Sequence, residues 1–167
     1  MPLTSDGRCY RVRPISAVDR EHLQIGLGKM SPTTLYQRFH HYRRAFTDAE
    51  LDFLTACDGK THIAYVCRAI DDDGEEGEGV GVARVYRDTR DPKVGEAAIV
   101  VIDSWQNTGV GTALIQALAD HCRQVGILDW RAVIVGDNDR VLHLLSRVGE
   151  VVERVWQDRS QVLRIRL

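Results

Sequence analysis

The stretch Gly95–Gly126 constrains the fold more than any other part of the chain. In it an apolar run of strand length, Ala97–Ile102, leads into a short turn with two glycines, Gln106–Gly111, which opens directly into a helix with one apolar face. The first turn of a helix leaves N–H groups without intrahelical partners, and the helix dipole adds partial positive charge there. Glycines let the backbone bend and approach a ligand closely. The stretch therefore predicts a strand, an anion-binding turn and a helix, with a phosphate or pyrophosphate as the ligand.

Two common phosphate-binding motifs fit this turn badly. A P-loop needs Lys and then Ser or Thr after its last glycine, but Gly111 is followed by Thr112 and Ala113. A dinucleotide-binding fingerprint needs a third Gly or Ala where Leu114 stands, and its strand begins a βαβ unit rather than lying past mid-chain. The first motif is excluded and the second is weak.

Hydrophobic periodicity, caps and turn residues predict the other elements. Strands are expected at Tyr10–Ile15, His62–Ile70, Val80–Tyr86, Ala97–Ile102, Trp130–Val135, Val151–Trp156 and Gln161–Leu167. Helices are expected after the caps or turns at Ser16, Ser31-Pro32, Thr47, Gly111 and Asn138, the last ending at Gly149. The acidic linker 71–78 is interpreted as a solvated hairpin tip, or alternatively as a charge that attracts a cationic acceptor.

The pattern Val101-x-x-x-x-Gln106-x-x-Gly109-x-Gly111 resembles the coenzyme A pyrophosphate loop of the GNAT superfamily of acyl-CoA N-acyltransferases, written Gln/Arg-x-x-Gly-x-Gly/Ala after an apolar strand. The segment Met30–Phe39 looks like the paired-helix region of GNAT proteins related to bacterial protein lysine acetyltransferases. The expected order of elements matches that family over nearly the whole chain.

The resemblance implies an α/β (α+β) fold, with a mixed, mostly antiparallel sheet and helices on both faces, in a single domain over 1–167. In that family the central strand and the strand after the loop helix splay apart, and coenzyme A enters the gap. The cofactor would therefore lie between Ala97–Ile102 and Trp130–Val135.

Residues that match the family pattern are expected to bind acetyl-CoA. The strand residues Ile99, Val100 and Val101 would line the pantetheine arm, with the backbone of Ile99 and Val101 pairing with it as another strand would. The pyrophosphate would be wrapped by the N–H groups of Gln106, Asn107, Thr108, Gly109, Val110, Gly111 and Thr112. Asn138 would contact the pantetheine arm. Many members have Gly where this chain has Asn107, but Asn tolerates a left-handed backbone.

The reaction implied is transfer of an acetyl group from the thioester to a primary amine, of a protein lysine or a small molecule. A protonated amine must lose a proton before it attacks, and Glu96 is the expected base, with a pKa raised by burial. The alternative is that Glu96 is only an edge carboxylate facing solvent. The N–H of Val101 would polarise the thioester carbonyl like an oxyanion hole.

One departure from the family leaves a second function open. Many members have a Tyr acid seven residues after the Asn, where this chain has Leu145. The thiolate then takes a proton from another donor or leaves directly. A non-catalytic acyl-CoA-binding sensor or interaction module is therefore the rival hypothesis to an N-acetyltransferase.

Composition and charge limit the kinds of partner that the chain is expected to bind and the compartment in which it is expected to lie. The 167 residues carry a net charge of −2, which gives no electrostatic footprint for nucleic acid or an anionic membrane. The four cysteines have no CxxC spacing and no signal peptide is visible, so we expect buried free thiols in a cytoplasmic protein. The six histidines lack the spacing of metal ligands, and no metal is expected; His40-His41 is interpreted as a helix surface pair. A monomer or a homodimer is expected.

Overall fold

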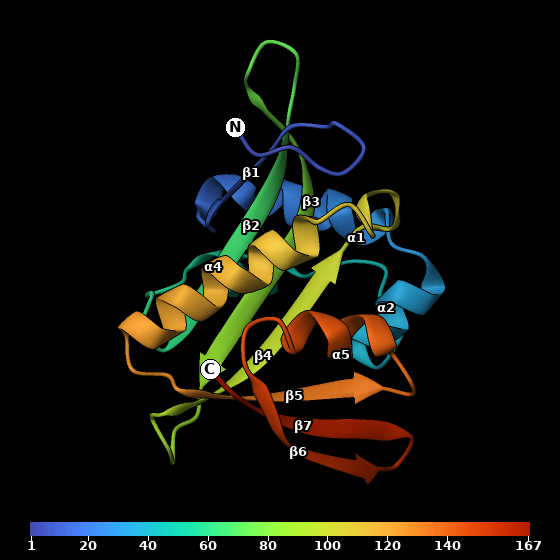
Figure 1. Ribbon diagram of the computed structural model, residues 1–167. Coiled ribbons are helices and arrows are strands. Elements are labelled where there is room, and N and C mark those ends of the chain that lie inside the picture. The colour runs from blue at the N-terminus through green and yellow to red at the C-terminus, as the bar shows by residue number, and fades with distance from the viewer.

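The computed structural model describes residues 1–167, which form one seven-stranded sheet in the order β1-β2-β3-β4-β5-β7-β6 (Figure 1). Neighbouring strands are antiparallel except β4 and β5, which are parallel. The strands are β1 (Tyr10–Pro14), β2 (His62–Ile70), β3 (Glu76–Arg87), β4 (Val94–Val101), β5 (Asp129–Val135), β6 (Glu150–Gln157) and β7 (Ser160–Arg166). The predicted mixed, mostly antiparallel sheet is confirmed.

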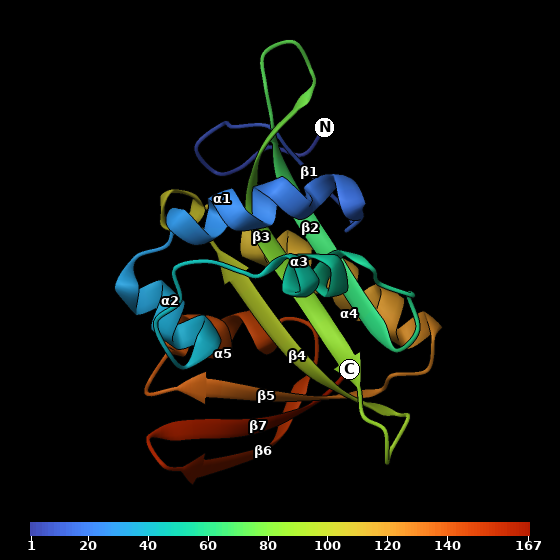
Figure 2. The same ribbon diagram turned by 180° about the vertical axis from the view of Figure 1, so that it is seen from behind.

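Helices cover both faces of the sheet. Helices α4 and α5 lie on the face seen in Figure 1, and α1, α2 and α3 lie on the face seen in Figure 2. The bounds are α1 (Arg20–Gly28), α2 (Pro32–Phe39), α3 (Asp48–Thr55), α4 (Val110–Gln124) and α5 (Asp139–Leu145). None of these helices is both long and apolar enough to cross a lipid bilayer.

Local sequence explains where the helices begin. Ser31 accepts a hydrogen bond from the Thr34 N–H at 3.2 Å, and Pro32 occupies the first helical position, where no N–H is needed. At α3 the Thr47 hydroxyl accepts from the Glu50 N–H, and the Glu50 carboxylate accepts from the Thr47 N–H at 2.8 Å. This is the predicted capping box.

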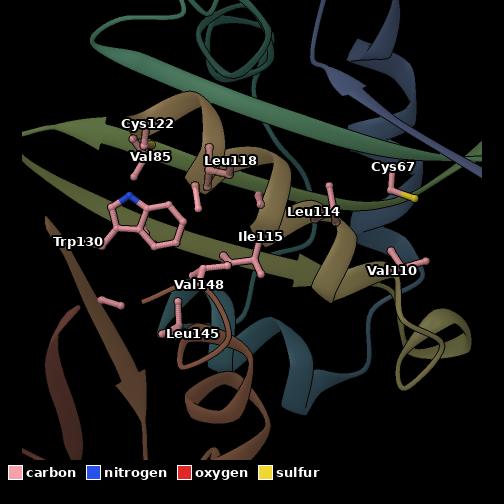
Figure 3. Close-up of a cluster of buried hydrophobic side chains, with 14 of the residues drawn as sticks. Cys67, Val85, Val110, Leu114, Ile115, Leu118, Cys122, Trp130, Leu145 and Val148 are labelled. Carbon is pink, nitrogen blue, oxygen red and sulfur yellow. The ribbon is translucent and has the colours of Figure 1, made fainter. Parts of the chain in front are cut away.

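The main core lies between α4 and the sheet, as Figure 3 shows. The apolar face of α4 supplies fully buried side chains, among them Leu114, Ile115 and Leu118, which face Val85 of β3 and Trp130 of β5. This packing fixes α4, and hence the turn before it, relative to the middle of the sheet.

The two strands in the middle of the sheet, β4 and β5, pair over only part of their length. Strand β4 pairs with β5 only over Val94, Gly95 and Glu96, which oppose 129–131, although β4 continues to Val101 and β5 to Val135. The two strands meet at one end and diverge toward the other, as Figure 1 shows. The family-based expectation of a splayed pair is confirmed.

Three smaller expectations needed correction. The linker 71–78 forms a largely exposed hairpin tip only over 71–75, because strand β3 begins at Glu76, which opposes Ile70 of β2 and pairs with Arg13 at 2.6 Å. Helix α5 ends at Leu145 rather than at Gly149, and Gly149 instead packs where a side chain would collide with the β7 backbone. The pair 40–41 follows α2 instead of lying on it, because residue 40 adopts a left-handed conformation with φ 61°.

Candidate active site

The divergence of β4 and β5 creates a cleft. It encloses about 460 Å³, lies between the two strands and is covered by α5. Its lining comes from β4, β5, α4, α5 with its cap, and two residues of α2: Gln37, Arg38, Ala97, Ala98, Ile99, Ile115, Ala132, Val133, Ile134, Asn138, Val141 and Leu145. Most of these side chains are small or apolar, so the cleft suits a narrow, flexible chain.

The edge of β4 that borders this cleft has free backbone groups. The Ile102 N–H donates to the Val80 carbonyl of β3 at 2.9 Å, and in an antiparallel pair such groups alternate along the strand. Ile99 and Val101 therefore direct their N–H and C=O groups away from β3, toward the gap. The Val101 carbonyl accepts from the Gln106 side chain at 3.0 Å, which leaves the Val101 N–H free. Val100 alternates with them, and its backbone faces β3.

The turn before α4 presents a continuous row of unpaired donors. The six successive N–H groups from Asn107 to Thr112 donate to no acceptor in the structure, and the next one, of Ala113, donates to the Gly109 carbonyl at 3.1 Å. Asn107 has φ 60° and Gly109 φ 97°, so both use the left-handed region. Asn107 and Gly109 are exposed, and Gly111 and Thr112 are half-buried. The predicted anion-binding turn is open to ligands.

Neighbouring segments hold this turn in place. The buried Thr108 hydroxyl donates to the Trp105 carbonyl at 2.6 Å, and the Thr108 carbonyl accepts from the Ser5 N–H at 3.1 Å. The Gln106 side chain lies against the end of β4, and its carbonyl accepts from Arg140 of α5 at 3.3 Å. The donors are thus fixed before any ligand arrives, which lowers the cost of binding.

Asn138 lies on the other side of the cleft. It caps α5 by accepting from the Val141 N–H at 3.5 Å, and its side chain lines the cleft. Seven residues on, Leu145 is buried at the floor of the same cleft, with 2% of its surface exposed. The structure thus places an apolar side chain where the resemblance would put a tyrosine acid.

Glu96 lies at the point where the two strands part. It is the last residue of β4 paired with β5, opposite Arg131, and on its other side it opposes Tyr86 of β3. The expected burial is absent, because the residue is exposed, and it forms no ion pair. It faces the side of the sheet covered by α1–α3, since side chains alternate along β4 and Ala97 lies in the α4 core.

A second cavity lies on that side of the sheet. It encloses about 620 Å³ beneath α1, α2 and α3. Arg38 of α2 lines both cavities, and Arg84 of β3 lines only the second. Sequence reasoning selected neither arginine. A signal was present for Arg84, which stands in phase with the apolar residues Val80 and Val82 of the same strand.

No group of three or more His, Cys, Asp or Glu side chains is arranged to hold a metal ion. All four cysteines are free thiols; Cys67 and Cys122 are buried, and Cys9 and Cys57 are half-buried.

Comparison with known proteins identifies relatives that match most of this chain. The model of the acetyltransferase (GNAT) family matches residues 20–149. The acetyltransferase Pat of Mycolicibacterium smegmatis is 30% identical over 145 residues, which are 87% of this chain and 42% of Pat. The acetyltransferase PA5475 of Pseudomonas aeruginosa is 30% identical over 158 residues, which are 95% of this chain and 83% of that protein. The chain thus spans less than half of the length of Pat.

Solved structures show the same fold. The GNAT domain of S. lividans PAT superposes with a TM-score of 0.84 at 24% identity, covering 99% of this chain and 95% of that one. The protein yncA of Salmonella typhimurium, solved with its cofactor acetyl-CoA, superposes with a TM-score of 0.73 at 18% identity, covering 94% and 93% of the two chains.

Proposed function

Because the chain belongs to the acetyltransferase (GNAT) family, we propose that it transfers an acetyl group from acetyl-CoA to a primary amine, of a protein lysine or a small molecule. The observation that carries the proposal is the row of six unpaired N–H groups, from Asn107 to Thr112, in the turn that Gln106 ties to the end of β4 and to α5. A diphosphate held there would leave the cleft free for a narrow chain that ends in a thioester.

The remaining residues fit this assignment. The free groups of Ile99 and the N–H of Val101 would pair with the amide groups of the pantetheine arm, and Asn138 would contact that arm from the other wall. Val100, expected to line the same arm, has its side chain in the wall of the cavity beneath α1–α3 instead. Acetyl-CoA supplies the acetyl group as a thioester, an acyl donor that an amine can attack.

Glu96 is proposed as the base. An exposed carboxylate at the point where β4 and β5 separate can take a proton from an incoming ammonium group directly or through one water molecule. The neutral amine then attacks the thioester carbon, the C–S bond breaks, and the second amine proton goes to the departing sulfur. The Val101 N–H would stabilise the negative oxygen in between.

A second candidate is a module that binds acyl-CoA without catalysis. The buried Leu145, in place of a tyrosine acid, favours it. The two candidates share the cofactor cleft and differ only in turnover.

Binding and turnover should therefore be measured separately. We expect calorimetry to detect acetyl-CoA binding, and thiol release to occur with at least one amine from a panel that includes a lysine peptide. Glu96→Gln should bind acetyl-CoA like the wild type but lose roughly 10²-fold or more in kcat, as for the loss of a general base. Glu153→Gln is the matched control, because Glu153 is an exposed strand residue on the edge strand β6.

The outcomes separate the candidates. Binding without turnover for any amine would favour the non-catalytic module. Equal turnover by Glu96→Gln and Glu153→Gln would remove Glu96 from the mechanism. No binding at millimolar acetyl-CoA would contradict both candidates.

A further inference from the structure

The cavity beneath α1–α3 reaches the sheet on the face that carries Glu96. Its walls are mostly apolar, with side chains that include Leu23, Met30, Phe39, Phe46, Leu54 and Val100. Because Arg38 lines both this cavity and the cofactor cleft, the two spaces adjoin at that residue. A molecule in the larger cavity can therefore approach the end of the cleft from the opposite side of the sheet.

Arg84 is a buried cation without a counter-ion. Only 3% of its surface is exposed, and one guanidinium nitrogen, Nη1, donates to the Leu54 carbonyl at 3.2 Å and to His62 Nε2 at 3.0 Å. Burial, helped by the Arg84 charge, lowers the pKa of His62 to about 4, so this partner is neutral at pH 7. The other two nitrogens of Arg84 make no hydrogen bond. Neither of these two nitrogens is sealed away from solvent, so both are free to donate to a ligand in the cavity.

Arg38 adds a second cation at the same place. Burial and then the Arg84 charge lower the pKa of Arg38 to about 10, and Arg38 remains charged at neutral pH. It forms no hydrogen bond or ion pair, and its guanidinium lies over its neighbour Phe39, 4.9 Å from the ring centroid. Two guanidinium groups thus share one region of an apolar cavity.

The carboxylates nearby do not neutralise these arginines. Asp19 lines the cavity but accepts from Arg13 at 2.8 Å and from Arg68 at 2.9 Å. Glu96 forms no ion pair with Arg38 or Arg84, and its charge only partly offsets the burial and the Arg84 charge that lower the pKa of Arg38. Since guanidinium groups bind carboxylates through paired hydrogen bonds, the missing partner has the chemistry of a carboxylate.

We propose that Arg84 and Arg38 bind a carboxylate of the acceptor, which is then a small amine of the amino-acid type with an apolar side chain. The inference rests on the proposed acetyl transfer and specifies its acceptor. Arg84 lies opposite Ala98 of β4, and Glu96 precedes Ala98 by two residues on the same face, a rise of about 7 Å. An acceptor whose carboxylate is held at Arg84 would have its amine on the side of Glu96, and the apolar wall would contact its side chain.

The test compares leucine with 3-methylbutylamine, which is leucine without its carboxylate. The measured quantity is the ratio of kcat/KM for the two amines within each enzyme, so that intrinsic amine reactivity cancels between variants. Wild type should acetylate leucine more efficiently. Arg38→Gln and Arg84→Gln should each lower the ratio about tenfold or more, as expected for the loss of a charged hydrogen bond. Arg44→Gln is the matched control, because Arg44 is exposed and lies just beyond α2.

Arg38→Gln guards against misfolding, since Arg38 has no hydrogen bond to lose, whereas Arg84 tethers α3 through Leu54. A ratio that is unchanged in Arg38→Gln, or a wild type that prefers 3-methylbutylamine or accepts only a lysine peptide, would overturn the inference and leave acetyl transfer intact.

A binding measurement that needs no turnover tests the carboxylate site separately from the proposed acetyl transfer. Calorimetry should show that N-acetyl-leucine binds more tightly than N-acetyl-3-methylbutylamine, and that Arg38→Gln removes the difference. If this holds but no amine is acetylated, the carboxylate site stands and the proposed transfer fails. If the two compounds bind equally, the carboxylate site fails whatever the turnover.

Discussion

Two glycines in the anion-binding turn give a sharp test of its role. Gly109 has φ 97°, which an alanine adopts only with strain of roughly 1–3 kcal/mol. Gly111 lies outside that region, and a Cβ there would meet the flexible end of Leu144 at 3.3 Å and, in ordinary contact, Val101 at 3.9 Å. Gly109→Ala should therefore strain the turn and destabilise the folded protein, whereas Gly111→Ala should leave its stability almost unchanged.

The backbone strain in Gly109→Ala should also weaken the binding of acetyl-CoA. If the turn relaxes to relieve the strain, its N–H groups no longer converge, and losing one hydrogen bond to a charged group costs about 1.5–3 kcal/mol. Since about 1.4 kcal/mol is a factor of ten, Gly109→Ala should bind acetyl-CoA at least tenfold more weakly, and Gly111→Ala within about twofold of wild type. Calorimetry measures the affinities, and urea unfolding should show a loss of about 1–3 kcal/mol in Gly109→Ala alone. Equal affinities for the two variants would refute the reasoning.

Two further predictions concern buried charges. Burial lowers the pKa of His62 from 6.5 to about 4 in the folded protein. The unfolded chain therefore binds a proton first as the pH falls, and the free energy of unfolding drops by roughly 3 kcal/mol between pH 6.5 and pH 4. Above pH 6.5, His62 is neutral in both states and this loss is absent. His62→Gln should remove this part of the slope in urea unfolding, and an unchanged slope would contradict it. Asp19→Asn should cost about 3–5 kcal/mol, because it leaves the buried Arg68 and the half-buried Arg13 without their fully buried partner. Asp48→Asn, which loosens an exposed ion pair, should cost less than about 1 kcal/mol, and similar losses in both variants would argue against the buried pair.

The parts of the fold that the sequence predicts well are those with local causes. The turn before α4 is encoded by Gly109 and Gly111 between an apolar strand and an amphipathic helix, and the structure has all three elements. The caps at Ser31 and Thr47 are equally local, and both form as predicted. The divergence of β4 from β5 required the family resemblance, because nothing in either strand alone limits their pairing to three residues.

The parts that could not be predicted depend on contacts between distant segments. Arg84 is buried because α3, some 30 residues earlier in the chain, covers it and supplies the Leu54 carbonyl. Glu76 leaves the solvated linker because Arg13, from the first strand, pairs with it. The exposure of Glu96 depends in the same way on what the helices leave uncovered. A pattern of apolar residues cannot encode such pairings, since they depend on the tertiary arrangement.

The short seam between β4 and β5 has a mechanical consequence. Only three residue pairs of the strand ladder join the half of the sheet made by β1–β4 to the half made by β5–β7. A molecule that forms hydrogen bonds with both walls of the cleft would connect the two half-sheets in the region where β4 and β5 do not pair with each other. Ligand binding should therefore raise the stability of the whole chain and slow amide exchange along both walls.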